Sequence, residues 1–116
     1  MDPRVQKAIN QMEKQLHCEL SLGVMAQSVN LSSSRFRHLF KVETGTTPAQ
    51  YLKALRMRRA KELVETTFLN IKQIMSSIGM RDKRHFAKDF ERTYGVTPTQ
   101  HRARWHGTEP ATSLRL

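Results

Sequence analysis

The sequence feature that most constrains the fold is an internal repeat, in which two stretches carry the same ordered pattern of apolar residues, turn residues and a Thr-Pro pair. In the first part of each copy the partners lie 49 positions apart: Leu22, Met25, Val29 and Leu31 match Ile71, Ile74, Ile78 and Met80. After a turn the shift becomes 50 positions: Phe36, Phe40, Gly45, Thr47, Pro48 and Gln50 match Phe86, Phe90, Gly95, Thr97, Pro98 and Gln100. One inserted residue explains the change of shift. So many matches in order predict two copies of one small structural unit.

Each copy is predicted to be helical, because its apolar residues recur at three- and four-residue steps. Asn30 and Gly79 fall at the same turn of the two copies, and both residue types tolerate positive φ. Residues that commonly begin helices precede most of the apolar segments. A glycine, which commonly ends a helix, follows each of the two segments that contain a pair of phenylalanines. The expected helices begin at or near Asp2, Ser21, Ser32 or Ser33, Thr47, Asn70, Asp82 and Thr97. The first should end near His17, the third at Gly45 and the sixth at Gly95.

These signals predict an all-α, homeodomain-like fold of about seven helices, with two helix-turn-helix subdomains joined by a long linking helix. The expected boundaries are 1–46 for the first subdomain, 47–66 for the linking helix and 67–105 for the second subdomain, followed by a flexible tail over 106–116. We expect Phe36, Phe40, Phe86 and Phe90 to be core residues, and Trp105 to close the core of the second subdomain.

The charge indicates a polyanionic partner. Twenty Lys and Arg residues against ten Asp and Glu residues give a formal net charge of +10, more than solubility requires. Double-stranded DNA is the first candidate, and RNA or an anionic membrane surface is the alternative. A membrane-binding helix would collect its cations on one side of a single long amphipathic stretch. Here the cations occupy equivalent places in two short repeats, which favours nucleic acid.

In a helix-turn-helix unit the second helix enters the major groove, so its outward side chains are the candidate contacts. Arg37, Arg84 and Lys88 have the donors that suit guanine O6 and N7, and Ala87 suits a thymine methyl group. Hydroxyls and free N–H groups at helix starts, together with cations along the helix, suit phosphate oxygens. The expected phosphate-contacting residues are Ser32, Ser33, Lys41, Thr46, Thr47, Asp82, Arg92 and Thr97.

Several short motifs resemble the DNA-binding domain of the AraC/XylS (arabinose-regulator) transcription factors. They are MAQSVNLS from Met25, FKVETG from Phe40, and IGM from Ile78 leading through Phe86 and Phe90 to GVTP from Gly95. The resemblance covers roughly 5–104 and implies a sequence-specific DNA-binding transcription regulator that places two helices in adjacent major-groove segments. By position, it implies base contacts from Ser34, Arg37, His38, Lys83, Arg84, Ala87 and Lys88.

The sequence departs from the family pattern at two positions. Met80 stands where the family usually has Phe, and His101 replaces a common aromatic residue before Arg102. Family members usually carry a separate ligand-binding or dimerisation domain, and no strand alternation here could build one. We therefore expect either a stand-alone member or the C-terminal domain of a longer regulator. As this fragment the chain should be a monomer. Dimerisation through a missing domain and contact with RNA polymerase are both open possibilities.

Other functions find little support in the sequence. Cys18 is the only cysteine, so an intrachain disulfide is impossible. The five histidines have no cysteine or acidic partners at metal-ligand spacing, and no phosphate loop or nucleophile–base set is present. We expect no enzyme activity, no metal and no cofactor. The lack of a signal-peptide pattern or long apolar run predicts a cytoplasmic protein without membrane association.

Overall fold

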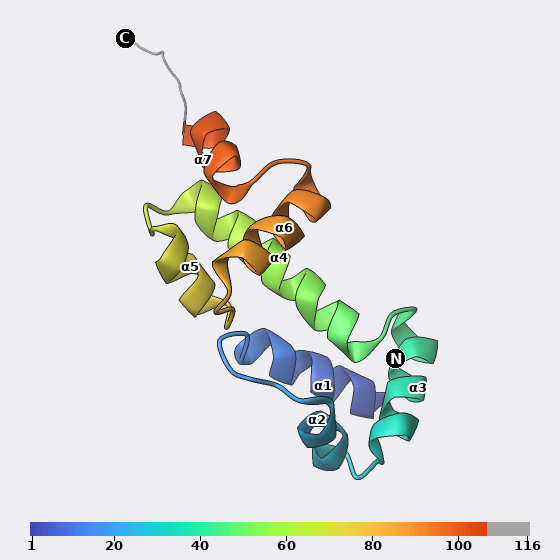
Figure 1. The fold of residues 1–116 in the computed structure, drawn as a ribbon. Helices are drawn as coiled ribbons and strands as arrows, with labels where there is room; N and C mark the ends of the chain where they lie inside the picture. The colour runs from blue at the N-terminus through green and yellow to red at the C-terminus, as the bar shows by residue number, and fades with distance from the viewer. Residues whose placement is uncertain (107–116) are drawn as a thin grey trace. The chain divides into compact units, whose positions relative to one another are not determined.

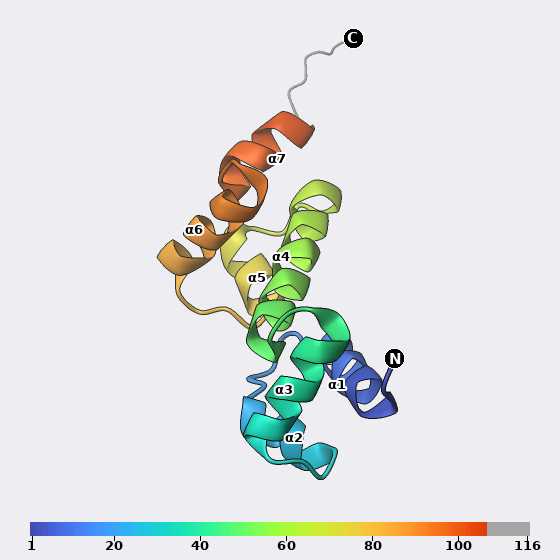
Figure 2. The same cartoon turned by 90° about the vertical axis from the view of Figure 1, so that its right-hand side faces the viewer.

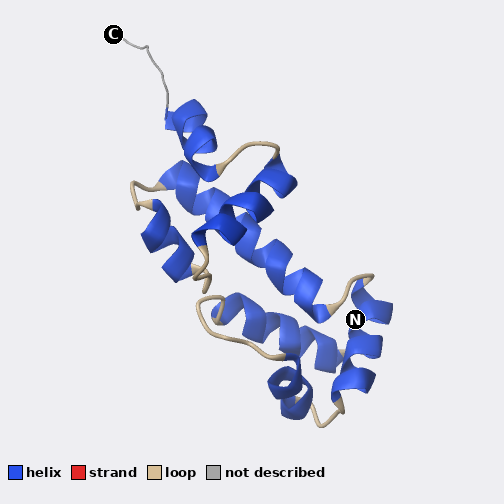
Figure 3. Ribbon diagram, viewed as in Figure 1, coloured by secondary structure: helices blue, strands red, loops and turns tan. Residues whose placement is uncertain are grey.

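The computed structural model describes residues 1–106, and each regular element in that part of the chain is a helix (Figures 1 and 3). The helices are α1 (Pro3–Lys14), α2 (Leu22–Ser28), α3 (Ser33–Thr44), α4 (Pro48–Thr66), α5 (Ile71–Ser77), α6 (Lys83–Tyr94) and α7 (Pro98–His106). The prediction of an all-α fold with about seven helices is confirmed. The expected flexible tail falls outside the described residues, apart from His106, which ends α7.

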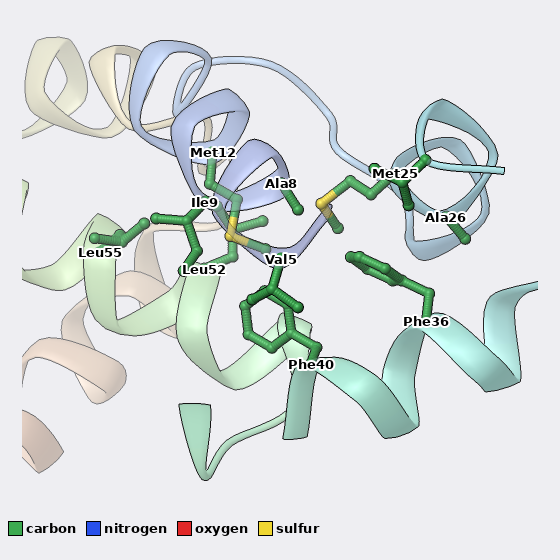
Figure 4. Packing of buried hydrophobic residues seen from close by; sticks show 11 residues of the cluster. Val5, Ala8, Ile9, Met12, Met25, Ala26, Phe36, Phe40, Leu52 and Leu55 are labelled. Atoms are coloured by element: carbon green, nitrogen blue, oxygen red, sulfur yellow. The ribbon is translucent and has the colours of Figure 1, made fainter. Parts of the chain in front are cut away.

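The first compact unit runs from Met1 to Arg56 and includes the beginning of α4. In both views, α1, α2 and α3 pack together (Figures 1 and 2). Phe36 and Phe40 of α3 are fully buried, with ring centroids 5.8 Å apart. Figure 4 shows their rings among apolar side chains from neighbouring helices; the buried cluster comprises Val5, Ala8, Ile9, Met12, Met25, Ala26, Val29, Phe36, Phe40, Leu52 and Leu55. These contacts hold α3 by one face only.

The second compact unit begins at Met57 and repeats this packing with the rest of α4, α5 and α6. Phe86 and Phe90 of α6 are fully buried, and their ring centroids lie 6.1 Å apart. The interplanar angle is 59° in both phenylalanine pairs. The buried cluster comprises Met57, Ala60, Leu63, Val64, Ile74, Met75, Ile78, Phe86 and Phe90. The expected burial of all four phenylalanines is confirmed.

The turns that precede α3 and α6 are also alike. Asn30 has a φ of 61° and Gly79 a φ of 74°, as expected for residues that permit the left-handed region. The amide of Leu31 donates to the carbonyl of Ala26 at 3.0 Å, and the amide of Met80 donates to that of Met75 at 2.9 Å. Each unit therefore turns from its short helix into its longer helix through the same local geometry.

Helix α1 ends three residues earlier than expected, at Lys14 rather than near His17. Arg56 explains the difference. Its guanidinium donates to the carbonyls of Leu16 and Cys18, at 3.3 and 2.9 Å, so these carbonyls are held outside a helix. Burial lowers the pKa of Arg56 from its usual value, since the charged form loses hydration.

Arg102 of α7 binds the end of α4 in a similar manner. Its guanidinium donates to the carbonyls of Leu63, Val64 and Thr67, at 3.5, 3.3 and 3.1 Å, and also to that of Leu69. The last carbonyls of a helix have no partner within the helix. Arg102 donates to two of them, those of Leu63 and Val64, and to two carbonyls of the following loop; the carbonyl of Leu63 also accepts the amide of Thr67.

Trp105 does not close the core of the second unit, and this prediction is wrong: its side chain is 59% exposed. His101 packs against the core of the second unit instead, at the position that corresponds to Tyr51 of the first unit. Its ring lies 5.9 Å from that of Phe90, much as Tyr51 lies 5.4 Å from Phe40 in the first unit. Trp105 is left outside, with its ring 5.8 Å from His101.

His101 also contacts Glu65 of α4. Its Nε2 lies 2.8 Å from Glu65 Oε2, and Lys61 Nζ donates to the same oxygen at 2.8 Å. Burial opposes ionisation of Glu65, whose side chain is 11% exposed. The hydrogen bonds from Lys61 and His101 outweigh burial and hold the pKa of Glu65 below its usual value. These contacts join α7 to α4.

Replacing Arg102 with Ala should lower the free energy of unfolding by about 1–3 kcal/mol, because the carbonyls of Val64, Thr67 and Leu69 would lose a donor. Urea unfolding followed by circular dichroism measures this change. Arg104→Ala is the matched control, since Arg104 is exposed on the same helix. Equal stability of the two variants would contradict a structural role for Arg102.

The lowered pKa of Glu65 predicts a pH-dependent contribution to stability. This contribution is present above the unfolded-state pKa and is lost as the pH falls through the folded-state pKa. Urea unfolding between about pH 6 and pH 3 should therefore show a shallower pH dependence for Glu65→Gln than for the wild type. Glu62→Gln, at a more exposed position of α4, is the control for removing one carboxylate from this helix. A slope unchanged by Glu65→Gln would refute the assignment.

Candidate nucleic-acid interface

The outward face of α3 follows from the inward position of its two phenylalanines. Ser34, Arg37, His38 and Lys41 are spaced by three, one and three residues, so they lie along one stripe of the helix, and all four are exposed. At the start of α3, Ser32 Oγ accepts the amide of Arg35 at 3.2 Å. This N-cap orders the helix end from which the stripe begins.

The corresponding face of α6 carries more charge. Lys83, Arg84 and Lys88 are exposed, Ala87 is half-buried, and the side chain of Arg92 is 73% exposed. At the start of this helix a carboxylate oxygen of Asp82 accepts the amide of His85 at 3.0 Å. That hydrogen bond is the largest influence on Asp82 and lowers the pKa of its carboxyl group.

Each of these faces is hollowed at equivalent positions. A depression of about 420 Å³ lies against α3, and one of about 290 Å³ lies against α6. Five residue pairs that line them are related by the shift of 50 found in the sequence: Ser34 and Arg84, Arg35 and His85, His38 and Lys88, Leu39 and Asp89, and Val42 and Arg92. The α3 depression has apolar residues at two of these positions, where the α6 depression has charged ones.

The threonines expected to contact phosphate lie elsewhere, at the starts of α4 and α7. Thr47 Oγ1 accepts the amide of Gln50 and Thr97 Oγ1 accepts the amide of Gln100, both at 3.2 Å. In return the two glutamine side chains accept the threonine amides, at 3.1 and 3.0 Å. Thr46 is half-buried beside Thr44. These threonines therefore belong to ordered helix starts separate from the α3 and α6 stripes.

Sequence reasoning missed several residues that line the depressions: Arg4, Arg35, Val42, His85 and Asp89. Asp89 is 2% exposed, although charged residues are seldom buried. The sequence repeat could have predicted that Asp89 is buried, because Asp89 corresponds to the apolar Leu39 at the shift of 50. A charged residue at an apolar position of a repeat identifies a place where the two copies differ.

Over residues 1–106, no three His, Cys, Asp or Glu side chains are grouped so that they could hold a metal ion. Within the same range, no helix is long and apolar enough to cross a membrane.

Two units that each contain a short helix, a positive-φ turn and a longer helix with an exposed polar face define a helix-turn-helix protein. A family model described as a helix-turn-helix domain matches residues 25–104. The HTH-type transcriptional activator RhaR from Mannheimia succiniciproducens is 35% identical over 98 residues, which are 84% of this chain and 34% of RhaR.

Solved structures agree. A transcriptional regulator described as an AraC-type DNA-binding domain-containing protein, from Chromobacterium violaceum, is 30% identical with a TM-score of 0.81, covering 94% of this chain and 96% of that one. The C-terminal domain of AraT, a response regulator from Geobacillus stearothermophilus, is 28% identical with a TM-score of 0.86, covering 95% and 92% of the two chains. The chain belongs to the AraC-type helix-turn-helix family, and the predicted resemblance is confirmed. It spans about a third of the length of RhaR and of the Msm operon regulatory protein of Streptococcus mutans.

Proposed function

We propose that this chain binds double-stranded DNA sequence-specifically, as the DNA-binding part of an AraC-type transcription regulator. The observation that carries the proposal is the repeated exposed stripe: α3 and α6 have equivalent positions in their units, and each turns polar and cationic side chains outward. The net charge of +10 supports a polyanionic ligand. Each of the two helices enters a major-groove segment, and the segments are adjacent.

In this proposal the two stripes contact base edges. Arg37, Arg84 and Lys88 donate to guanine O6 and N7, since these acceptors point into the major groove. Ala87 offers its methyl group to thymine, and its half-buried position suits a close approach of the helix. The remaining base contacts of the proposal come from Ser34, His38 and Lys83, all exposed.

Phosphate contacts fix the position of the chain on the duplex without carrying sequence information. We assign them to Ser32, Ser33, Lys41 and Arg92 beside the stripes, and to Thr46, Thr47 and Thr97 at the starts of α4 and α7. For Asp82 the contribution is indirect, because a carboxylate has the same sign of charge as phosphate. It caps α6 and so orders the free N–H groups at that helix end.

The wider assembly extends the proposal. RhaR is a transcriptional activator and the Chromobacterium violaceum protein a transcriptional regulator, so RNA polymerase is a candidate protein partner and the bacterial cytoplasm the expected location. This part of the protein binds as a monomer, and any dimer forms through a separate domain. The domain acts by binding, without enzyme chemistry.

The alternative is a basic helical module for RNA or for an anionic membrane surface. A competition experiment separates the two. A labelled duplex selected from a random library is challenged with unlabelled duplex, with structured RNA of equal length and with phosphatidylserine vesicles. Duplex DNA should be the strongest competitor. Stronger competition by RNA or by the vesicles would overturn the proposal.

Replacing Arg84 with Ala should weaken binding to the selected duplex by about 1–3 kcal/mol and relax the base preference at one position, because a bidentate contact to guanine is lost. Affinity for a random duplex should change much less. Fluorescence anisotropy at one salt concentration measures both affinities. Lys72→Ala, at an exposed position of α5, is the control for loss of one positive charge. Equal weakening on both duplexes would contradict a base contact by Arg84.

A further inference from the structure

Asp89, in the middle of α6, is buried in an unusual setting. It is 2% exposed, and no other charged residue among residues 1–106 is buried to this degree. It lines the same depression as Arg84, His85, Lys88 and Arg92. A buried carboxylate therefore lies beside three cations, Arg84, Lys88 and Arg92, that the proposed function assigns to DNA.

Each oxygen of this carboxylate is aimed at a different side chain on the exposed face. Asp89 Oδ2 lies 3.2 Å from His85 Nε2, and Asp89 Oδ1 lies 3.5 Å from Arg92 Nη1. His85 is 64% exposed and Arg92 is 73% exposed. Because His85 is four residues before Asp89 and Arg92 three residues after it, one buried group orients side chains on both adjacent turns of α6.

The first unit shows that the fold does not require a carboxylate here. Leu39 takes the equivalent position of α3 and packs against the buried cluster of its unit. Removing a carboxylate from water is costly, and an apolar residue in its place is often neutral or stabilising. A scaffold that works with Leu at this position indicates that Asp89 contributes something other than packing, and its contacts with His85 and Arg92 are at the surface.

We propose that Asp89 is a positioning residue that raises the DNA specificity of α6 at the expense of non-specific affinity. This inference rests on the proposed function. By holding His85 and Arg92, Asp89 fixes the direction from which Arg92 meets a phosphate, and so the position on the duplex at which the base-contacting residues of α6 act. Its negative charge also weakens the general attraction of this face to phosphate, which supplies most non-specific binding. Specificity is the difference in binding free energy between the preferred duplex and non-specific DNA. The positioning and the negative charge of Asp89 both increase this difference.

Two substitutions test the proposal. Asp89→Asn removes the charge with little change in shape, and Asp89→Leu reproduces the residue of the first unit. Glu91→Gln is the matched control, because Glu91 is exposed on the same helix and loses the same charge. Dissociation constants are measured for the selected duplex and for a random duplex at one salt concentration, together with the free energy of unfolding.

Both Asp89 variants should bind the selected duplex roughly tenfold more weakly than the wild type does. Their affinity for the random duplex should equal or exceed that of the wild type. Glu91→Gln should leave the ratio of the two affinities unchanged. In a His85→Ala/Arg92→Ala background, Asp89→Asn should no longer weaken specific binding, because the side chains that it positions are gone.

An unchanged ratio for both Asp89 variants would overturn the inference while leaving the proposed function intact. A parallel fall of both affinities together with the free energy of unfolding would also overturn it, and would assign Asp89 a purely structural role. A wild-type chain that prefers no duplex would defeat the proposed function itself, and this inference with it.

Discussion

The burial of a phenylalanine pair at positions i and i+4 is the interaction on which each unit depends. Phe36 and Phe40 in α3, and Phe86 and Phe90 in α6, are fully excluded from water. Because a helix turns once in 3.6 residues, fixing one face fixes the direction of every other side chain. Moving the pair by a single position would rotate the outward stripe by about 100° and bring other residues to the surface. The composition of the proposed interface is therefore set from the core.

The two units share this packing constraint but differ in the residues on their outward faces. The turn hydrogen bonds, the ring geometry and the left-handed glycines at the ends of α3 and α6 are nearly the same in both units. The outward residues differ: Ser34 corresponds to Arg84, His38 to Lys88, and Leu39 to Asp89. Two similar scaffolds with different outward side chains can present different chemistry to two stretches of one duplex. Such a pair gives a longer recognition sequence than one helix can contact.

Local signals allowed most of the fold to be predicted from the sequence. Capping by Ser21, Asn70 and Asp82, and the positive φ of Asn30 and Gly79, depend on neighbours within a few residues. Arg56 and Arg102 were missed because each binds carbonyls more than 30 positions away along the chain. Trp105 was wrongly placed in the core because His101 can pack as an aromatic ring while its Nε2 contacts Glu65. Asp89 was missed because helical periodicity assigns buried positions to apolar residues.

The most direct test of the central claim is selection of duplexes from a random library, followed by guanine N7 methylation interference on the preferred sequence. Two exposed stripes on duplicated helices predict two separate segments of interference in the major groove. Arg37→Ala should remove the interference at a guanine of one segment, and Arg84→Ala the interference at a guanine of the other. A single segment, the loss of both with either substitution, or no preferred sequence at all would contradict the account.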